Sequence, residues 1–254
     1  MSRSKVKNLI LLKQIHSAVT QIKKGKLDKA LETLDKAEKS ARQAKSTDAL
    51  YYILFTRGGI LYSAKEYDQA LETYERSLEV GSELLKTDPK NADYQHYMGT
   101  TLSNTGNLLR KKGERERAAE SYSSARKIYS DLITKNPENA VFRSYAGENL
   151  NNYGTLLTES GSLDTACKIL KEAVETYEQL LKEKPENLGY QAELSVALSQ
   201  LGSCLKQQEP EKAETAKTNL ERALKMQENL LAQQPENEKI KEDITLTRER
   251  LEGL

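Results

Sequence analysis

The stretch that decides the fold is residues 139–185, NAVFRSYAGENLNNYGTLLTESGSLDTACKILKEAVETYEQLLKEKP. Its apolar and small residues recur roughly every three to four positions, which is the period of a helix with one buried face. The pattern predicts two helices, one ending at about Glu159 and one running from near Leu163 to about Lys182. The segment therefore reads as a pair of antiparallel helices.

The ends of these two helices are marked by residues with known terminal preferences. Asn139 can cap the first helix, and Ser160-Gly161 can end it because glycine tolerates a positive φ. Pro185 prevents continuation of the second helix. The same asparagine position follows a proline at three other places: Asn91, Asn187 and Asn237.

The pattern of this segment recurs along the chain every 48 residues. The columns that carry the period are Gly58, Gly106, Gly154 and Gly202; Pro89, Pro137 and Pro185; and Leu54, Leu102, Leu150 and Leu198. A two-residue insertion near Glu209-Pro210 lengthens the last interval. One period over so many columns predicts a stack of similar helix pairs.

We expect a single domain over residues 1–254, and the period divides this domain into successive repeats. The predicted segments are a degenerate first repeat at 4–48, full repeats at 49–91, 92–139, 140–187 and 188–236, and a capping helix at 237–254. The capping helix is expected because the last pair would otherwise leave an apolar edge exposed to water.

The residues of one repeat resemble the tetratricopeptide signature in type and order: Leu102, Gly106, Leu109, Gly113, Ala118, Tyr122, Ala125 and Pro137. The usual repeat has about 34 residues, so this chain resembles the long-repeat tetratricopeptide proteins of methanogenic archaea. It is more distantly similar to kinesin light-chain repeats, whose LNNLG-like string has a counterpart in residues 150–154. The resemblance implies an all-α, right-handed solenoid of five antiparallel helix pairs and a non-enzymatic scaffold or adaptor role, with a co-chaperone-like role as one form.

The same resemblance implies a concave groove lined by the first helix of each pair. The candidate peptide-binding residues on it are Asn104, Asn107, Asn151, Asn152, Gln200, Arg110, Tyr52 and Phe55. In the resembled families, asparagine in the column of Asn104 and Asn152 holds peptide backbone, and an amide can donate and accept at once. The alternative is that these amides only favour helix geometry or solvate the groove. Tyr52 and Phe55 could receive an apolar side chain of the partner.

The chaperone-tail version of this fold holds two carboxylates with basic residues on consecutive first helices. Asn107 and Asn152 resemble its amides, but Val196 and Gln200 stand where the basic residues should follow. A highly acidic C-terminal tail is therefore not the expected ligand of the groove.

Composition limits the other function classes. The net charge of +1 supplies no strong field for nucleic acid, and we expect no nucleic-acid partner. The apolar run Leu9–Leu12 is too short for a membrane span or a signal peptide, so no membrane association is expected. Sparse cysteine use favours a reducing compartment, so we expect a cytoplasmic protein with Cys204 as a core thiol and Cys167 inert.

No catalytic, nucleotide-binding or metal-binding motif is found in the sequence, so we expect no cofactor, no metal and no enzyme activity. Two pairs of tyrosines recur in interior columns, and we expect them to pack with their hydroxyls at the surface. They are Tyr74 and Tyr122, and Tyr129 and Tyr177.

Two further hypotheses concern surfaces outside the groove. One is a structural or assembly role through self-association of the repeats. The other concerns a basic N-terminal hairpin, which is either a solvated end or a weak docking site for an acidic partner. Its lysines are Lys5, Lys7, Lys13, Lys23, Lys24, Lys26 and Lys29.

Overall fold

The computed structural model describes residues 3–208 and 210–253. The side chains of residues 3–10 and 210 lie outside the description, as do residues 1, 2, 209 and 254. Lys5 and Lys7 of the basic hairpin, and the insertion residues Glu209 and Pro210, are therefore not placed in detail.

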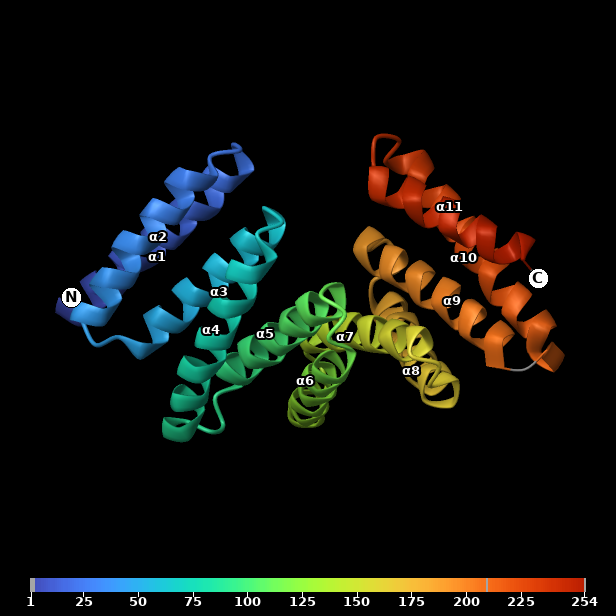
Figure 1. Ribbon diagram of the computed structural model, residues 1–254, viewed down its shortest axis with the longest axis horizontal. Helices are drawn as coiled ribbons and strands as arrows, with labels where there is room; N and C mark the ends of the chain where they lie inside the picture. Colours follow the sequence, from blue (N-terminus) through green and yellow to red (C-terminus); the bar gives the residue numbers. More distant parts are fainter. Residues whose placement is uncertain (1–2, 209, 254) are drawn as a thin grey trace. The chain divides into compact units, whose positions relative to one another are not determined.

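The described residues form eleven α-helices and one 3₁₀ turn, without a strand (Figure 1). Their bounds are α1 Arg3–Lys23, α2 Leu27–Gln43, α3 Thr47–Ser63, α4 Tyr67–Thr87, α5 Ala92–Lys111, α6 Arg115–Lys135, α7 Ala140–Glu159, α8 Leu163–Glu183, α9 Leu188–Gln208, η1 Pro210–Lys212, α10 Ala213–Gln233 and α11 Glu238–Glu252. The predicted all-α architecture of helix pairs followed by one final helix is confirmed.

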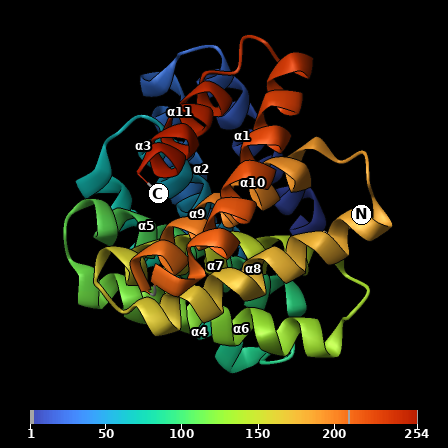
Figure 2. The same cartoon turned by 90° about the vertical axis from the view of Figure 1, so that its right-hand side faces the viewer.

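The helices fall into two compact units, Met1–Lys112 with α1–α5 and Gly113–Leu254 with α6–α11. In the first unit, α1 packs on α2 and α3 on α4. In the second unit, α7 packs on α8, and α9 packs on both α8 and α10 (Figure 2). The last helix, α11, covers α9 and α10 and buries Ile240 and Ile244.

The helix ends follow the predicted terminal chemistry. The Asn139 side chain accepts hydrogen bonds from the backbone N–H groups of Val141 (3.0 Å) and Phe142 (3.3 Å). Gly161 has a φ of +75°, the left-handed conformation expected of it. The caps at Asn91, Asn187 and Asn237 accept in the same way.

The two helices of a pair approach so closely that a side chain cannot fit between them. A Cβ atom on Gly154 would lie 2.5 Å from Cγ of Leu170. One on Gly202 would lie 2.7 Å from Cγ of Leu220 and 2.9 Å from the backbone oxygen of Ala216. Gly58, Gly154 and Gly202 of the glycine column therefore mark lines of helix–helix contact, as a close-packed interior requires.

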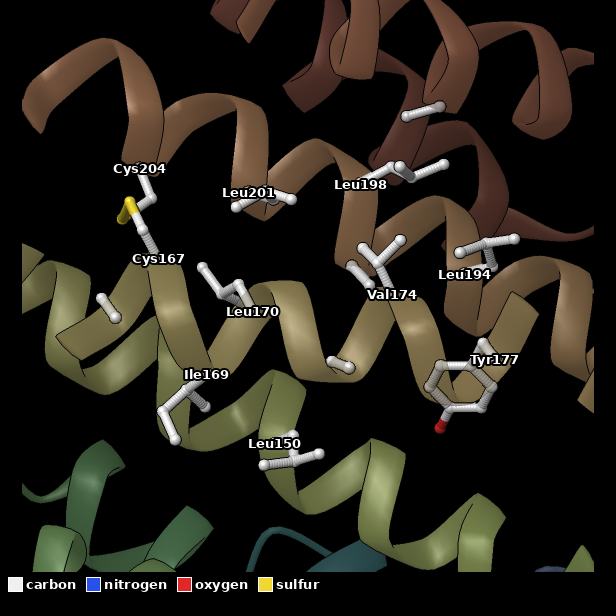
Figure 3. Close-up of a cluster of buried hydrophobic side chains, with 14 of the residues drawn as sticks. Leu150, Cys167, Ile169, Leu170, Val174, Tyr177, Leu194, Leu198, Leu201 and Cys204 are labelled. Carbon is white, nitrogen blue, oxygen red and sulfur yellow. A yellow bond between two sulfur atoms is a disulfide. The ribbon is translucent and has the colours of Figure 1, made fainter. Parts of the chain in front are cut away.

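The core of the second unit contains a covalent bond that the sequence did not predict. Cys167 of α8 and Cys204 of α9 form a disulfide with a Cα–Cα distance of 5.8 Å, beside Leu170 and Leu201 (Figure 3). The expectation of two free thiols was wrong. The helices run antiparallel, so an early residue of α8 meets a late residue of α9.

The interior tyrosines pack as predicted, but their hydroxyls are not at the surface. Tyr74, Tyr122, Tyr129 and Tyr177 are at most 1% exposed. The Tyr177 hydroxyl donates to the Ser144 carbonyl at 3.1 Å, and the Tyr74 hydroxyl accepts from Asn104 at 3.3 Å. The hydroxyls of Tyr74 and Tyr177 thus each have a partner on a neighbouring helix, because a buried polar group is costly without one.

None of the described helices combines the length and the apolar character needed to cross a membrane.

We predict that Gly202→Ala lowers the free energy of unfolding by about 1–3 kcal/mol, because the added methyl group meets backbone as well as Leu220. The matched control is Gly59→Ala, also within a helix, where the new Cβ lies 3.6 Å from the Tyr74 hydroxyl. That change should raise the free energy of unfolding by up to about 1 kcal/mol, since alanine favours helix. Urea unfolding measures both, and equal effects of the two variants would contradict the close approach.

Candidate functional site

The first helices of successive pairs form one surface in each unit, which we call the first-helix face. In the second unit this face consists of α7, α9 and α11, since α9 contacts both α7 and α11. In the first unit α1 contacts α3, and α3 reaches α5 through the Tyr51 hydroxyl, 3.5 Å from Oγ1 of Thr101. All eight candidate peptide-binding residues lie on these helices.

The aromatic candidates of the first unit belong to one cluster. The ring of Tyr52 meets that of Tyr97 edge to face at a centroid distance of 4.9 Å, and Phe55 meets Tyr97 at 5.6 Å. Burial raises the pKa of Tyr52 to about 12, with a smaller effect from Tyr97. The half-buried cluster joins α3 to α5.

The candidate residues Asn104, Asn107 and Arg110 of the first unit are partly buried, and Asn104 already has a hydrogen-bond partner. The Asn104 amide donates to the buried Tyr74 hydroxyl of α4 at 3.3 Å. Asn107 and Arg110 are half-buried on the same helix. Asn104 therefore contributes to packing between α4 and α5, and its replacement would disturb both packing and any contact with a partner.

In the second unit, two adjacent asparagines of α7 differ in surroundings. Asn151 is 3% exposed, and its amide donates to the backbone oxygen of Glu193 at 3.3 Å, which ties α7 to α9. Asn152 is half-buried and makes no side-chain hydrogen bond with any other described residue. Asn152 is thus the asparagine of this pair that remains available to a ligand.

Gln200 lines a polar pocket of about 200 Å³ on the same face. Its side-chain oxygen is buried without a hydrogen-bond partner among the described residues. The other lining residues are Thr155, Thr158, Glu159, Ser203, Gln207 and Arg250. Three of them, Thr155, Thr158 and Ser203, carry hydroxyls, so the pocket is suited to hydrogen-bonding groups.

Arg250 is the functional candidate that the sequence reasoning missed. It stands on α11, its guanidinium donates to Oγ of Ser199 at 2.8 Å, and no carboxylate of the described residues lies within ion-pair distance. Burial lowers its pKa, against the opposing effect of Asp243. The repeat spacing of the sequence could have identified it. Arg250 follows Gln200 by the same interval that separates Pro235 from Pro185, so it is the position on the last helix equivalent to Gln200.

Three carboxylates complete this face: Glu148 of α7, Glu193 of α9 and Asp243 of α11. The Glu148 side chain reaches solvent, yet the surrounding protein removes much of its hydration and raises its pKa, with Glu193 adding repulsion. Loss of hydration raises the pKa of Asp243 too, while Lys239 opposes this. None of the three forms an ion pair within the described part of the chain.

No group of three or more His, Cys, Asp or Glu side chains among the described residues is placed to hold a metal ion.

The raised pKa of Glu148 predicts a pH effect on stability. A carboxyl group that binds its proton more tightly in the folded state stabilises the fold below its ordinary pKa, and this contribution is lost as the pH rises through the raised value. Glu148→Gln should therefore gain stability relative to the unchanged protein between about pH 4 and pH 7. Urea unfolding across this range measures the difference. The exposed control Glu236→Gln should show none, and a Glu148→Gln difference independent of pH would contradict the prediction.

Comparison with known proteins agrees with this architecture. The family model described as a tetratricopeptide repeat matches residues 150–186. No curated protein sequence matches the chain.

Three solved structures share the fold at low sequence identity. BtubC from P. vanneervenii is 21% identical, with a TM-score of 0.70 over 86% of this chain and 80% of that chain. A putative kinesin light chain of Podosopora anserina with nearly identical TPR-like repeats is 15% identical, with a TM-score of 0.59 over 85% and 94%. A thermophilic TPR protein of Thermus thermophilus is 17% identical, with a TM-score of 0.53 over 93% and 98%.

These matches bear out the resemblance to tetratricopeptide proteins and kinesin light-chain repeats, while the resemblance to archaeal proteins stays a prediction. The chain contains a tetratricopeptide repeat at residues 150–186 and has the fold of the tetratricopeptide repeat proteins.

Proposed function

We propose that this protein is a non-enzymatic scaffold that binds a peptide segment of a partner protein on the first-helix face. The tetratricopeptide fold supports a role in protein–protein interaction. The observation that carries the finer proposal is the pair Asn152 and Gln200, whose amides face no hydrogen-bond partner within the described chain. A co-chaperone-like role is a narrower form of the same proposal.

A peptide backbone carries the hydrogen-bond donors and acceptors that the side-chain amides of Asn152 and Gln200 do not find within the described chain. A buried acceptor such as the Gln200 oxygen costs about 1–3 kcal/mol when it has no donor, and a peptide N–H would supply one. The carbonyl of the same peptide could accept from Arg250, which stands beside Gln200 in the pocket. These hydrogen bonds are made to the backbone of the peptide and not to its side chains, so peptides of many sequences could form them.

The side chains around the amides indicate the class of peptide. Glu148, Glu193 and Asp243 have no ion-pair partner in the described chain, so a lysine or arginine of the ligand would be attracted to them. Tyr145 and Leu246 on this face are 38% and 45% exposed. We therefore expect a segment that combines basic and apolar residues.

The test uses peptides selected on the purified protein from a random display library. Asn152→Ala with Gln200→Ala should weaken the selected peptides by about tenfold to a hundredfold, the equivalent of 1–3 kcal/mol of lost hydrogen bonding. Calorimetry measures the affinity. Asn104 is left unchanged because its amide holds Tyr74.

The matched control is Asn229→Ala, an exposed amide on the second helix α10. It should leave the affinity unchanged. If the double variant keeps full affinity and full helicity, the first-helix face of this unit is not the peptide site.

The alternative function is an assembly module that acts through self-association. Leu12 and Val19 of α1 are 58% and 37% exposed, and their spacing of seven residues places them on one side of the helix. Sedimentation over a range of concentrations separates the two functions. A protein that stays monomeric argues against assembly, and a dimer that Leu12→Ser dissolves argues for it.

The basic hairpin is a separate, weaker proposal for an acidic partner. Lys23, Lys24, Lys26 and Lys29 are exposed around the turn between α1 and α2 and form no ion pair with described residues. Binding there should be lost between low and physiological salt, because exposed charges are screened beyond about 8–10 Å. Changing Lys23, Lys24 and Lys26 to Glu should abolish capture of an acidic peptide such as oligoglutamate. If capture is unchanged, the lysines only solvate this end of the first unit and form no binding site.

The predicted cytoplasmic location also remains a proposal. In that compartment the Cys167–Cys204 disulfide would meet a reducing pool of thiols.

A further inference from the structure

The disulfide occupies a specific place in the second unit. Helices α8 and α9 are antiparallel and are joined at one end by the loop over residues 184–187. Cys167 lies near the start of α8 and Cys204 near the end of α9, so the disulfide joins the end of the pair that has no loop (Figure 3). Without it, this end of the two helices would be held by side-chain packing and by the hydrogen bond from Gln208 of α9 to Asp164 of α8.

A groove is lined by one of the two cysteines and not by the other. It has a volume of about 610 Å³ and lies along α8, α9 and α10, on the side of the second helices. Cys167 is 8% exposed and lines the groove together with Leu201 and Leu205. Cys204 is fully buried and is not part of the lining.

We propose that Cys167–Cys204 is a reversible redox site, in which a small thiol enters the groove and attacks the sulfur of Cys167. The inference does not depend on peptide binding at the first-helix face. The reductant belongs to the class of monothiols such as glutathione. In reducing compartments, the disulfides that do form are mostly transient or redox-sensing.

The exchange consumes two thiols. The first attacks Sγ of Cys167 as a thiolate; a sulfur–sulfur bond forms to it while the Cys167–Cys204 bond breaks, and Cys204 leaves as a thiolate that takes a proton from water. The second thiolate attacks the mixed disulfide at the sulfur of the small thiol and releases Cys167, which is protonated in turn. The protein disulfide gains two electrons, and two small thiols become one small disulfide.

The surroundings of both sulfurs suit this reaction. Lys168 lines the groove together with Cys167 and has no ion-pair partner within the described chain, so its positive charge attracts an incoming thiolate. Asp164, another residue of the lining, accepts a hydrogen bond from Gln208 at 2.5 Å. Sγ of Cys204 lies 3.5 Å from the carbonyl oxygen of Leu163, which accepts a hydrogen bond once the sulfur carries a proton.

Reduction should loosen the end of the pair that the disulfide holds. The second turn of α8 and the next-to-last turn of α9 lose their covalent link, while the loop at the other end remains. The groove is bounded by α8 and α10 near this end, so its width should depend on the redox state.

The first experiment follows reduction of the folded, full-length protein by glutathione. The rate should rise in proportion to glutathione concentration without a plateau, since the attacked sulfur is reached in the native state. The mixed disulfide, trapped with acid and mapped by mass spectrometry, should be on Cys167. Oxidised glutathione should then restore the protein disulfide without loss of helicity.

The second experiment compares single variants with iodoacetamide. Cys167 in the variant Cys204→Ser should be alkylated about tenfold faster or more than Cys204 in the variant Cys167→Ser, and urea should abolish the difference. Hydrogen exchange at residues 166–170 of α8, whose N–H groups have helical acceptors, should accelerate on reduction in the unchanged protein and not in the double variant Cys167→Ser, Cys204→Ser.

Three results would overturn the proposal. One is a reduction rate that levels off at the separately measured rate of unfolding. The others are a mixed disulfide that maps to Cys204 and equal alkylation of the two single variants in the native state.

Discussion

The close approach of α7 to α8 and of α9 to α10 determines how the second unit is built. At Gly154 and Gly202 the facing side chains of Leu170 and Leu220 leave no room for even one carbon atom. This contact fixes which side of each first helix turns inward against its partner. The opposite side is then free to carry Asn152 and Gln200, one from each successive pair.

The features that the sequence predicted are local or periodic. The two helices of a pair, their asparagine caps and the positive φ of Gly161 follow from residues within a few positions of one another. The hydroxyl partners of Tyr74 and Tyr177 and the Cys167–Cys204 bond join different helices, and no spacing in one sequence encodes such meetings.

The candidate site was predicted in part for the same reason. The periodic register put Asn104, Asn152 and Gln200 in one column of the first helices, but it did not show that Asn151 is packed against α9, because burial depends on the neighbouring helix. Arg250 and Asp243 could have been found from the sequence. Each follows Gln200 or Glu193 by the same number of residues that separates Pro235 from Pro185, so they are the equivalent positions on the last helix. The second unit thus has two chemically distinct sides: amides and carboxylates on the first helices, and a groove with the disulfide beside the second helices.

Peptide binding on the first-helix face requires that its side-chain amides contact peptide backbone. Two-dimensional NMR of side-chain amide groups, assigned through the single variants, detects such contacts. On addition of a peptide selected from a random library, the Asn152 and Gln200 signals should shift in proportion to bound peptide while the Asn229 signal on α10 stays fixed. Saturating peptide that leaves both Asn152 and Gln200 unmoved would contradict peptide binding on this face.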